Sequence, residues 1–358
     1  MTIINPSRPD LFPEVNIAAS SACEFLMTLY AFCTVDDGHE FDYEIGRGWF
    51  DAIEARISPA LRASIEHFDK HVWKDAVGLA YDCEPPRDVP ALLARVEALD
   101  AFDLRLTLLG YYSREVRRKL PANVILRAAE GDAKAQKQFF KALEFDKSAT
   151  QKNLRLLFAL DAETMRERML EIMRLWYDEV YREHEAQVLP ILLRDAEASL
   201  ALKQTVSPAR LIELVTNGLE YVPESSVREV LLLPSFIMRP YVSNEVYRNA
   251  HIFVYPVADE SLTEDTNAPP ARLVRLYKAL ADERRLRVLQ KLAHQGLSLQ
   301  ELADEFGVSR STMHHHMVIL RSSGLVGLRT SDHRYRLRED TIANAPEWLG
   351  AYLKRETE

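Results

Sequence analysis

The sequence predicts a mainly α-helical protein: a large helical N-terminal domain with a small β-hairpin or strand pair, followed by a small C-terminal domain of helices and a hairpin. Only 12 of the 358 residues are glycine, and the segment 137–189 contains neither glycine nor proline. Glycine costs about 1 kcal/mol in a helix interior relative to alanine, so this composition favours helix. A hydrophobic share of 47% and a charged share of 28% are typical of a globular chain.

The N-terminal domain, expected over residues 1–258, has helical periodicity along much of its length. One apolar stripe at helical spacing predicts a buried helix face. Its members are Met165, Met169, Ile172, Met173, Trp176 and Val180. Pro190 is expected to kink or split the helical tract around it. Residues 227–242 and 251–259 are apolar and β-branched and are bounded by prolines, so they predict the pair of strands.

Two clusters in this domain allow both a functional and a structural interpretation. His67 and His71 are separated by one helical turn, with Asp75 a turn later, which is a spacing that can bind a metal ion. The neighbouring apolar residues equally predict an ordinary amphipathic helix, and we favour that interpretation. A basic cluster could bind an anionic effector or form a salt-bridged helix face, and we favour the second. Its members are Arg114, Arg117, Arg118 and Lys119.

Charge and composition separate the C-terminal part of the chain from the rest. Residues 271–342 carry thirteen basic and eight acidic side chains, a net charge of +5 in a chain whose net charge is −9. An acidic, polar stretch with a proline pair predicts a linker over 259–270. This charge asymmetry indicates a polyanion-binding module over 271–342, and a solvated charged face is the alternative. A C-terminal helix is expected over 343–358.

Four helices and a hairpin are expected in this C-terminal segment. Ser298 and Ser309 are the expected N-caps of the third and fourth helices, and Gly324 is the expected stop of the fourth. Two short helices joined by a glycine-containing turn form a helix-turn-helix. Beyond it, two β-prone runs around a turn at 331–332 predict a basic hairpin, which would form a wing.

These segments resemble the winged-helix DNA-binding domain of the ArsR-type regulator family. The resemblance covers about a fifth of the chain. It is carried by LYKALADERRLRVLQKL and by LADEFGVSRSTMHHHMVILRSSGLV, which spans the helix-turn-helix. It implies a transcriptional regulator, by default a repressor, that binds double-stranded operator DNA as a homodimer. The N-terminal domain is similar to an uncharacterised domain found ahead of such winged helices, and we expect it to sense an unknown small-molecule effector.

The three consecutive histidines, 314–316, lie on the fourth helix, where successive side chains point about 100° apart and cannot close on one metal ion. The inward stripe of this helix is Met313, His316, Met317 and Leu320. Its opposite side would meet base edges and phosphates in a major groove, while the wing would grip phosphate. The residues expected to bind DNA are Ser309, Arg310, Ser311, Thr312, His314, His315, Arg321, Arg329, His333, Arg334 and Arg336.

No metal, cofactor or catalytic site is expected. Ser298, Gln300 and Ala303 stand where the resemblance places metal-binding thiolates, and the terminal helix lacks the histidine of the family's second metal site. The three cysteines contain no CxxC pair, which argues against a disulfide framework. The chain also contains no GxGxxG, P-loop, GxSxG or HExxH motif, so we do not expect an enzyme.

Location and alternative functions follow from the remaining features. The first residues lack the basic and apolar segments of a signal peptide, and no apolar run reaches the roughly 18 to 20 residues that span a bilayer, so a cytoplasmic location is expected. One alternative is an enzyme or protein-interaction domain at the N-terminus, with the winged helix as tether or autoregulator. A polar pocket with converging acid, base or nucleophile groups would favour an enzyme, and a mostly apolar pocket would favour a sensor.

Overall fold

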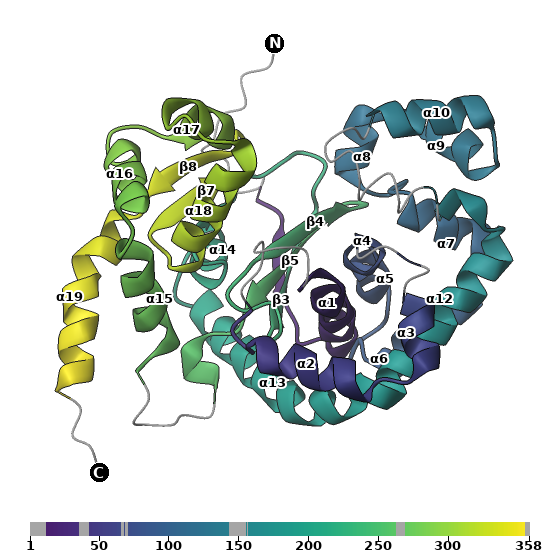
Figure 1. The fold of residues 1–358 in the computed structure, drawn as a ribbon, viewed down its shortest axis with the longest axis horizontal. Coiled ribbons are helices and arrows are strands. Elements are labelled where there is room, and N and C mark those ends of the chain that lie inside the picture. Colours follow the sequence, from purple (N-terminus) through teal and green to yellow (C-terminus); the bar gives the residue numbers. More distant parts are fainter. Residues whose placement is uncertain are drawn as a thin grey trace.

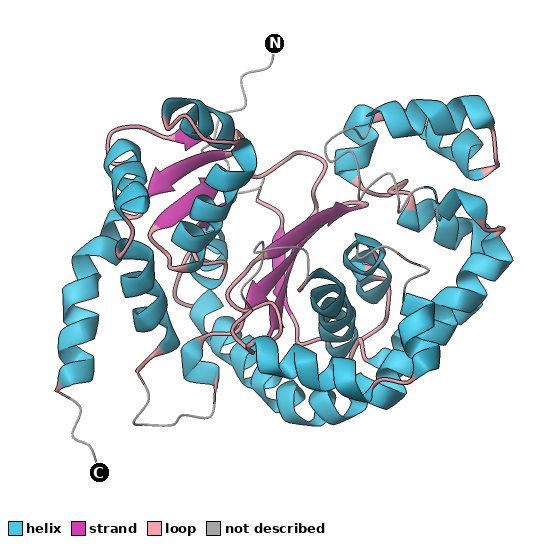
Figure 2. Cartoon of the chain, viewed as in Figure 1, coloured by secondary structure: helices cyan, strands magenta, loops and turns pink. Residues whose placement is uncertain are grey.

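The computed structural model describes residues 12–35, 43–65, 68, 71–142, 155, 157–262 and 269–354. The chain is mainly α-helical, as predicted, and its helices surround a four-stranded sheet in the N-terminal part (Figure 1). A second, smaller sheet lies in the C-terminal part (Figure 2). Within these ranges, no helix is long and apolar enough to cross a membrane.

Two sequence-based expectations fall partly or wholly outside the described residues. His67 lies outside them, and the side chain of His71 is not described either, so metal binding by this pair stays a prediction. Half of the expected linker, residues 263–268, is also outside them. Among the described residues, no three His, Cys, Asp or Glu side chains gather as a metal site would require.

The N-terminal sheet contains four strands, whereas the sequence predicted only a strand pair. The strands are β1 (Glu14–Ile17), β3 (Glu229–Ser235), β4 (Ser243–Tyr247) and β5 (Ala250–Pro256), in the order β1-β3-β5-β4. The predicted segments contain β3 and β5, which pair in parallel, and β1 also runs parallel to β3, while β4 is antiparallel to β5. Because β1 is short and its partner is more than two hundred residues away, its local sequence carries little strand signal.

Both faces of this sheet are buried. Val230 and Leu232 of β3 pack with α13 (Arg182–Lys203) and α14 (Pro208–Val215), while Leu231 packs on the other side with α1 (Ser21–Thr34). Figure 1 shows α1 at the centre of the N-terminal part, beside the sheet. A sheet covered on both faces requires apolar side chains at successive positions, which explains the uninterrupted apolar run of β3.

A buried carboxylate fixes the connection that follows β3. The side chain of Glu24, in the first turn of α1, accepts hydrogen bonds from the backbone N–H groups of Phe236 (3.2 Å) and Ile237 (2.8 Å) and from the Ser235 hydroxyl. Burial raises the pKa of Glu24 to about 7. The carboxyl group therefore links the central helix to the end of the central strand.

The remaining N-terminal helices are α2 (Arg47–Arg56), α3 (Pro59–Ile65), α4 (His71–Asp75), α5 (Val77–Tyr81), α6 (Val89–Ala98), α7 (Ala101–Leu108), α8 (Arg114–Lys119), α9 (Ala122–Ala129), α10 (Ala133–Ala142) and α12 (Ala162–Trp176). Among them, α4, α5 and α6 pack on α1. The Met and Trp stripe on α12, which continues to Val180, is buried and forms core as expected. The basic cluster on α8 is ion-paired, with Arg114 2.7 Å and Arg118 2.9 Å from Glu224, which confirms the salt-bridged interpretation.

The helical tract around Pro190 is not split, and a kink at this residue stays a prediction. A π-helical turn, η2 (Tyr177–Tyr181), joins α12 to α13, and α13 continues through Pro190 without being split. Val188 and Leu192, on either side of the proline, are buried. Their packing keeps the flanking turns helical although the proline supplies no backbone N–H.

The C-terminal part forms the predicted helices and hairpin. Its elements are α15 (Ala271–Leu280), α16 (Glu283–Leu292), β6 (Leu297–Ser298), α17 (Leu299–Glu305), α18 (Arg310–Ser322), β7 (Val326–Arg329), β8 (Arg334–Leu337) and α19 (Glu339–Leu353). Both expected N-caps are present, because the hydroxyls of Ser298 and Ser309 accept from the backbone N–H three residues on. Gly324 ends α18 with a φ of 74°. The last helix begins at Glu339, ahead of the expected 343, and it packs on α15, where Arg272 lies 4.0 Å from the Trp348 ring.

One strand joins the two parts of the chain in a way that the sequence did not predict. β2 (Leu219–Glu220) follows α14 and pairs in parallel with β7, so the C-terminal sheet has the order β2-β7-β8-β6. Two residues are too few to show a strand period. The wing is thereby attached to a segment that was assigned to the N-terminal domain.

Candidate nucleic-acid interface

The first turn of α18 is exposed, and the Ser309 side chain caps one of its backbone N–H groups. The Ser309 hydroxyl accepts a hydrogen bond from the Thr312 backbone N–H (3.0 Å) and lies 2.8 Å from the Thr312 hydroxyl. Ser309, Arg310, Ser311 and Thr312 are all exposed. A helix N-terminus carries a partial positive charge, so this turn offers an electrostatically favourable contact for a phosphate group.

The inner stripe of α18 is buried as expected. Met313, Met317 and Leu320 are fully buried, and His316 is 9% exposed. Burial lowers the pKa of His316, and no described residue accepts from or donates to its Nδ1 atom. A buried imidazole with a lowered pKa is neutral near pH 7. His316 therefore belongs to the core that anchors the helix.

The outer side of α18 is open over its N-terminal half. His315 is exposed and His314 is half-buried, so the consecutive histidines lie in three different environments. Arg310 is exposed and forms no ion pair with any residue that the structure describes. An unpaired guanidinium at the start of a helix is free to pair with guanine or phosphate. Contact with DNA by these residues stays a prediction.

Arg321 lies at the opposite end of α18 and differs from the other expected contacts. It is half-buried, and burial lowers its pKa. Its backbone carbonyl accepts a hydrogen bond from the Asn217 side-chain amide (3.3 Å). With a rise of 1.5 Å per residue, it stands roughly 16 Å along the helix from Arg310. The backbone of Arg321 therefore lies beside the N-terminal part, while its side chain lies near Tyr335 of β8.

The four expected wing contacts fall into two pairs. His333 lies at the hairpin turn with a φ of 52°, and both it and Arg336 are exposed. Neither forms an ion pair with a described residue. Arg329 instead pairs with Glu220 (2.7 Å), and Arg334 pairs with Glu301 (2.8 Å). His333 and Arg336 are the wing side chains available to a phosphate without breaking an ion pair.

The two occupied arginines have structural roles in the domain. Arg334 also donates to the Gly296 carbonyl (2.6 Å), and its partner Glu301 accepts from the Ser298 backbone N–H in the capping box of α17. Arg334 thus ties β8 to the start of the helix-turn-helix. Arg329 ties β7 to β2, because its partner Glu220 lies on that strand.

The junction between α14 and the wing is held by several further contacts. The Asn217 amide donates to the carbonyls of Arg321 and Ser322, and the Gly218 carbonyl accepts from Leu328 (3.0 Å). Gly218 has a φ of 102°, and a side chain there would collide with the aliphatic part of Arg338. An Asn-Gly pair is a turn signal in the sequence, but its partners lie about a hundred residues away and were not predictable from it.

Comparison with known proteins supports the prediction that the C-terminal domain contains a helix-turn-helix. A family model described as a helix-turn-helix domain matches residues 280–329. The transcriptional activator HlyU of Vibrio cholerae serotype O1 is 42% identical over 59 residues, which are 16% of this chain and 55% of that protein. The transcriptional repressor SmtB homolog of a Synechocystis species is 36% identical over 85 residues, 23% of this chain and 64% of that protein.

These matches cover a small part of the chain. The chain spans between about half and two thirds of the length of these relatives, and comparison with solved structures finds no match.

Proposed function

We propose, from the premise that the C-terminal domain is an ArsR-type winged helix-turn-helix domain, that the chain is a DNA-binding transcriptional regulator. The observation that carries this proposal is the open face of α18, which joins a capped, exposed first turn to an unpaired Arg310. In this arrangement Arg310 and His315 would read base edges in the major groove. Arg336 and His333 of the wing would contact flanking phosphates.

The proposal includes assembly into a homodimer. A two-fold axis would place two α18 helices in major grooves about 34 Å apart, so the operator would be an inverted repeat. Large apolar side chains are exposed on the C-terminal helices, where a second copy could cover them. They are Tyr277 (38% exposed), Leu286 (48%), Ile342 (41%) and Leu353 (70%). Size measurement of the full chain with and without Ile342→Glu and Leu353→Glu tests this interface.

We further propose that the regulator represses by occluding a promoter and that the N-terminal part senses an effector. One relative is named an activator and the other a repressor. Whether this regulator represses or activates is therefore decided by measuring transcription. A mostly apolar cavity beside the winged helix supports sensing over catalysis, because pockets that bind small molecules without chemistry are mostly apolar.

Footprinting on the chain's own promoter region tests DNA binding. We expect a protected inverted repeat, with protection lost in Arg310→Ala and weakened as salt rises. Arg174→Ala is the matched control, because Arg174 is an exposed arginine on α12, away from the winged helix. Protection that is unchanged in Arg310→Ala, or absent on every DNA tested, would contradict the proposal.

A further inference from the structure

A cavity of about 680 Å³ lies between the N-terminal part and the winged helix. One wall comes from residues 43–46 and 236–241 of the N-terminal part, and the opposite wall comes from α15. Ile319 and Ser322, at the C-terminal end of α18, complete it. Binding pockets for small molecules commonly have volumes of about 300 to 1,000 Å³, so this cavity has room for one.

The lining of this cavity is apolar with an excess of cations. The apolar side chains are Tyr43, Ile45, Phe236, Pro240, Tyr241, Leu262, Val274 and Ile319. The cationic side chains are Arg239, Arg275, Lys278 and Arg285, and Glu44 is the only acid among the described lining residues. Flat and branched apolar groups favour a hydrophobic ligand body, while the charge excess favours a negative group on it.

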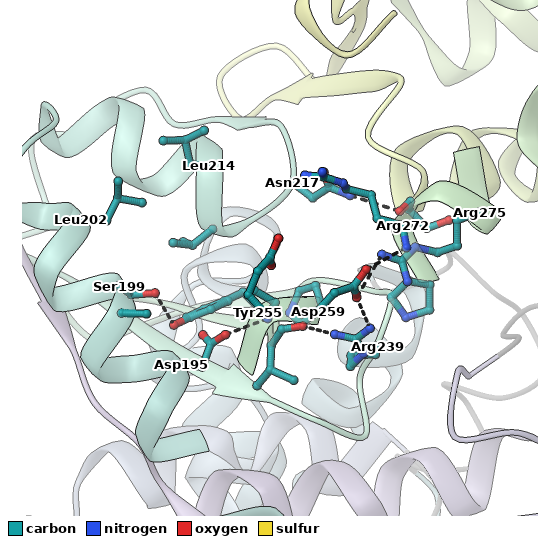
Figure 3. Close-up of a pocket in the computed structure, with 18 residues that line it drawn as sticks. Asp195, Ser199, Leu202, Leu214, Asn217, Arg239, Tyr255, Asp259, Arg272 and Arg275 are labelled. Atoms are coloured by element: carbon teal, nitrogen blue, oxygen red, sulfur yellow. Dashed lines mark hydrogen bonds and ion pairs between the residues drawn. The ribbon is translucent and has the colours of Figure 1, made fainter. Parts of the chain in front are cut away.

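Two arginines in the wall share acidic partners. Arg239 is 4% exposed and pairs with both Glu44 (2.7 Å) and Asp259, and Arg275 pairs with the same two carboxylates. Figure 3 shows Arg239, Asp259 and Arg275 pointing toward one another, beside a smaller cavity of about 280 Å³ that also contains Tyr255. This ion-pair cluster therefore separates the two cavities and bridges the N-terminal part to α15.

Arg275 and Lys278 present positive charge to the cavity. The Nε atom of Arg275 is buried and has no hydrogen-bond partner among the described residues. This atom is closed off from the cavity, so an incoming carboxylate would meet the cationic side chains that line it, Arg275 and Lys278, without reaching this Nε atom. Lys278, which is exposed on the next turn of α15, forms no ion pair with a described residue and adds a second cation at the cavity.

We propose that this cavity binds a small anionic amphiphile, a carboxylate or sulfonate on an aromatic or aliphatic body, as the effector of the regulator. The anion lies against Arg275 and Lys278, and the apolar body lies between Tyr241, Val274 and Ile319. The role of this ligand as an effector rests on the proposed regulator function, whereas its binding to the cavity does not. Because Ile319 belongs to α18, an occupant contacts the same helix that carries Arg310, and ligand and DNA affinities are then linked reciprocally.

Displacement of a fluorescent probe from the full chain tests the ligand class. Anilinonaphthalene sulfonate, itself an anionic aromatic, is expected to bind saturably. Decanoate is expected to displace it at about tenfold lower concentration than decanol, and decyltrimethylammonium is expected to be weaker still. Absence of saturable binding, or equal displacement by the three chain compounds, overturns the proposal.

Variants locate the bound probe. Lys278→Glu is expected to weaken binding of the probe about tenfold, and Val274→Trp, which places a large ring where the apolar body would lie, is expected to weaken it at least as much. Lys137→Glu makes the same charge change on an exposed lysine of α10, outside the cavity, and should leave affinity unchanged. Unfolding by urea, followed for each variant, shows that the fold is intact. Equal affinities for Lys278→Glu, Val274→Trp and the wild-type chain would place the probe elsewhere and overturn the site.

The same experiment separates this inference from the regulator function. Decanoate is expected to shift the affinity for promoter DNA in the wild-type chain and to leave Val274→Trp unaffected. Saturable probe binding by a chain that protects no DNA would contradict the regulator function and leave the site standing. DNA protection by a chain that lacks the probe site would contradict the site alone.

Discussion

The wing offers the sharpest test of the interface, because the structure divides its three arginines and one histidine into two available and two ion-paired side chains. Arg336 is exposed and unpaired among the described residues, whereas Arg329 is held by Glu220 through its Nε atom (2.9 Å) and a terminal nitrogen (2.7 Å). We expect Arg336→Ala to weaken DNA binding and Arg329→Ala to have little effect. Glu220→Gln should strengthen binding, because it releases Arg329.

The expected size follows from counterion release. Each phosphate contact contributes about 0.9 to the slope of log affinity against log salt for B-form DNA. The proposed dimer has two wings, so Arg336→Ala should reduce the slope by about 1.8, and Glu220→Gln should increase it by up to about 1.8. An exposed ion pair is worth only about 0.2 to 1 kcal/mol, which alone would not keep Arg329 from a phosphate.

Backbone pairing provides the additional constraint on Arg329. Glu220 lies on β2, which pairs with β7. Its backbone carbonyl accepts a hydrogen bond from the backbone N–H of Thr330 (3.0 Å), the residue that follows β7. The carboxylate therefore stays next to the wing even when its arginine turns away, and it would repel a phosphate brought to that position. Replacement of Glu220 by glutamine keeps the shape of the side chain and removes this repulsion.

The assay is fluorescence anisotropy of a labelled random-sequence duplex over a range of salt concentrations, since the phosphate contribution is independent of sequence. Glu163→Gln is the matched control, because Glu163 is an exposed acid paired with an arginine on α12. The reasoning fails if Arg329→Ala reduces the slope as much as Arg336→Ala, or if Glu220→Gln leaves both slope and affinity unchanged.

Three further predictions concern the core of the winged helix, the histidines of α18 and the N-terminal sheet. Met313→Ala removes a fully buried side chain of the winged-helix core and should lower the free energy of unfolding by about 2 to 5 kcal/mol in urea titration, and a loss near zero would contradict the assigned core. His315→Ala should lower DNA affinity without changing the melting temperature, while His316→Ala should lower the melting temperature, and the reverse pattern would show that the helix is rotated. His251 is 4% exposed, and burial lowers its pKa to about 4 from 6.5, so the folded state resists protonation and the free energy of unfolding should fall as pH drops from about 6.5 toward 4. That loss reaches about 2 kcal/mol at a pH of about 5 and should be absent in His251→Phe, whereas an equal acid loss in both chains would assign it to other groups.

The helix-turn-helix was predictable because its determinants are local. Ser298 and Ser309 cap helices within three residues of themselves, and Gly324 ends a helix through its own backbone angle. The inward stripe of α18 follows from the helical period alone. The predicted positions of these residues are confirmed, while their contacts with DNA stay a prediction.

The remaining features depend on contacts between distant parts of the chain. β1 and β2 are defined by partners on β3 and β7, and neither carries a period of its own. Arg329 and Arg334 were expected to be free because the sequence does not show that Glu220 and Glu301 fold beside them. Likewise, the cavity is lined by four separated segments, each unremarkable by itself. Local patterns fix caps and faces, whereas charge pairing and pockets are set by tertiary structure.

The two ends of α18 explain how the N-terminal part could influence DNA binding. The first turn, with Arg310, is open to solvent, while the last turn is held by Asn217 and borders the proposed ligand cavity through Ile319. A packed helix of this length moves as a rigid rod, because its core side chains fill well-defined positions. A displacement of the last turn by a ligand would therefore be carried to the first turn and would change its fit to the groove. Coupling between effector and operator thus needs no unfolding of the winged helix, only a shift of α18 against α14 and β2.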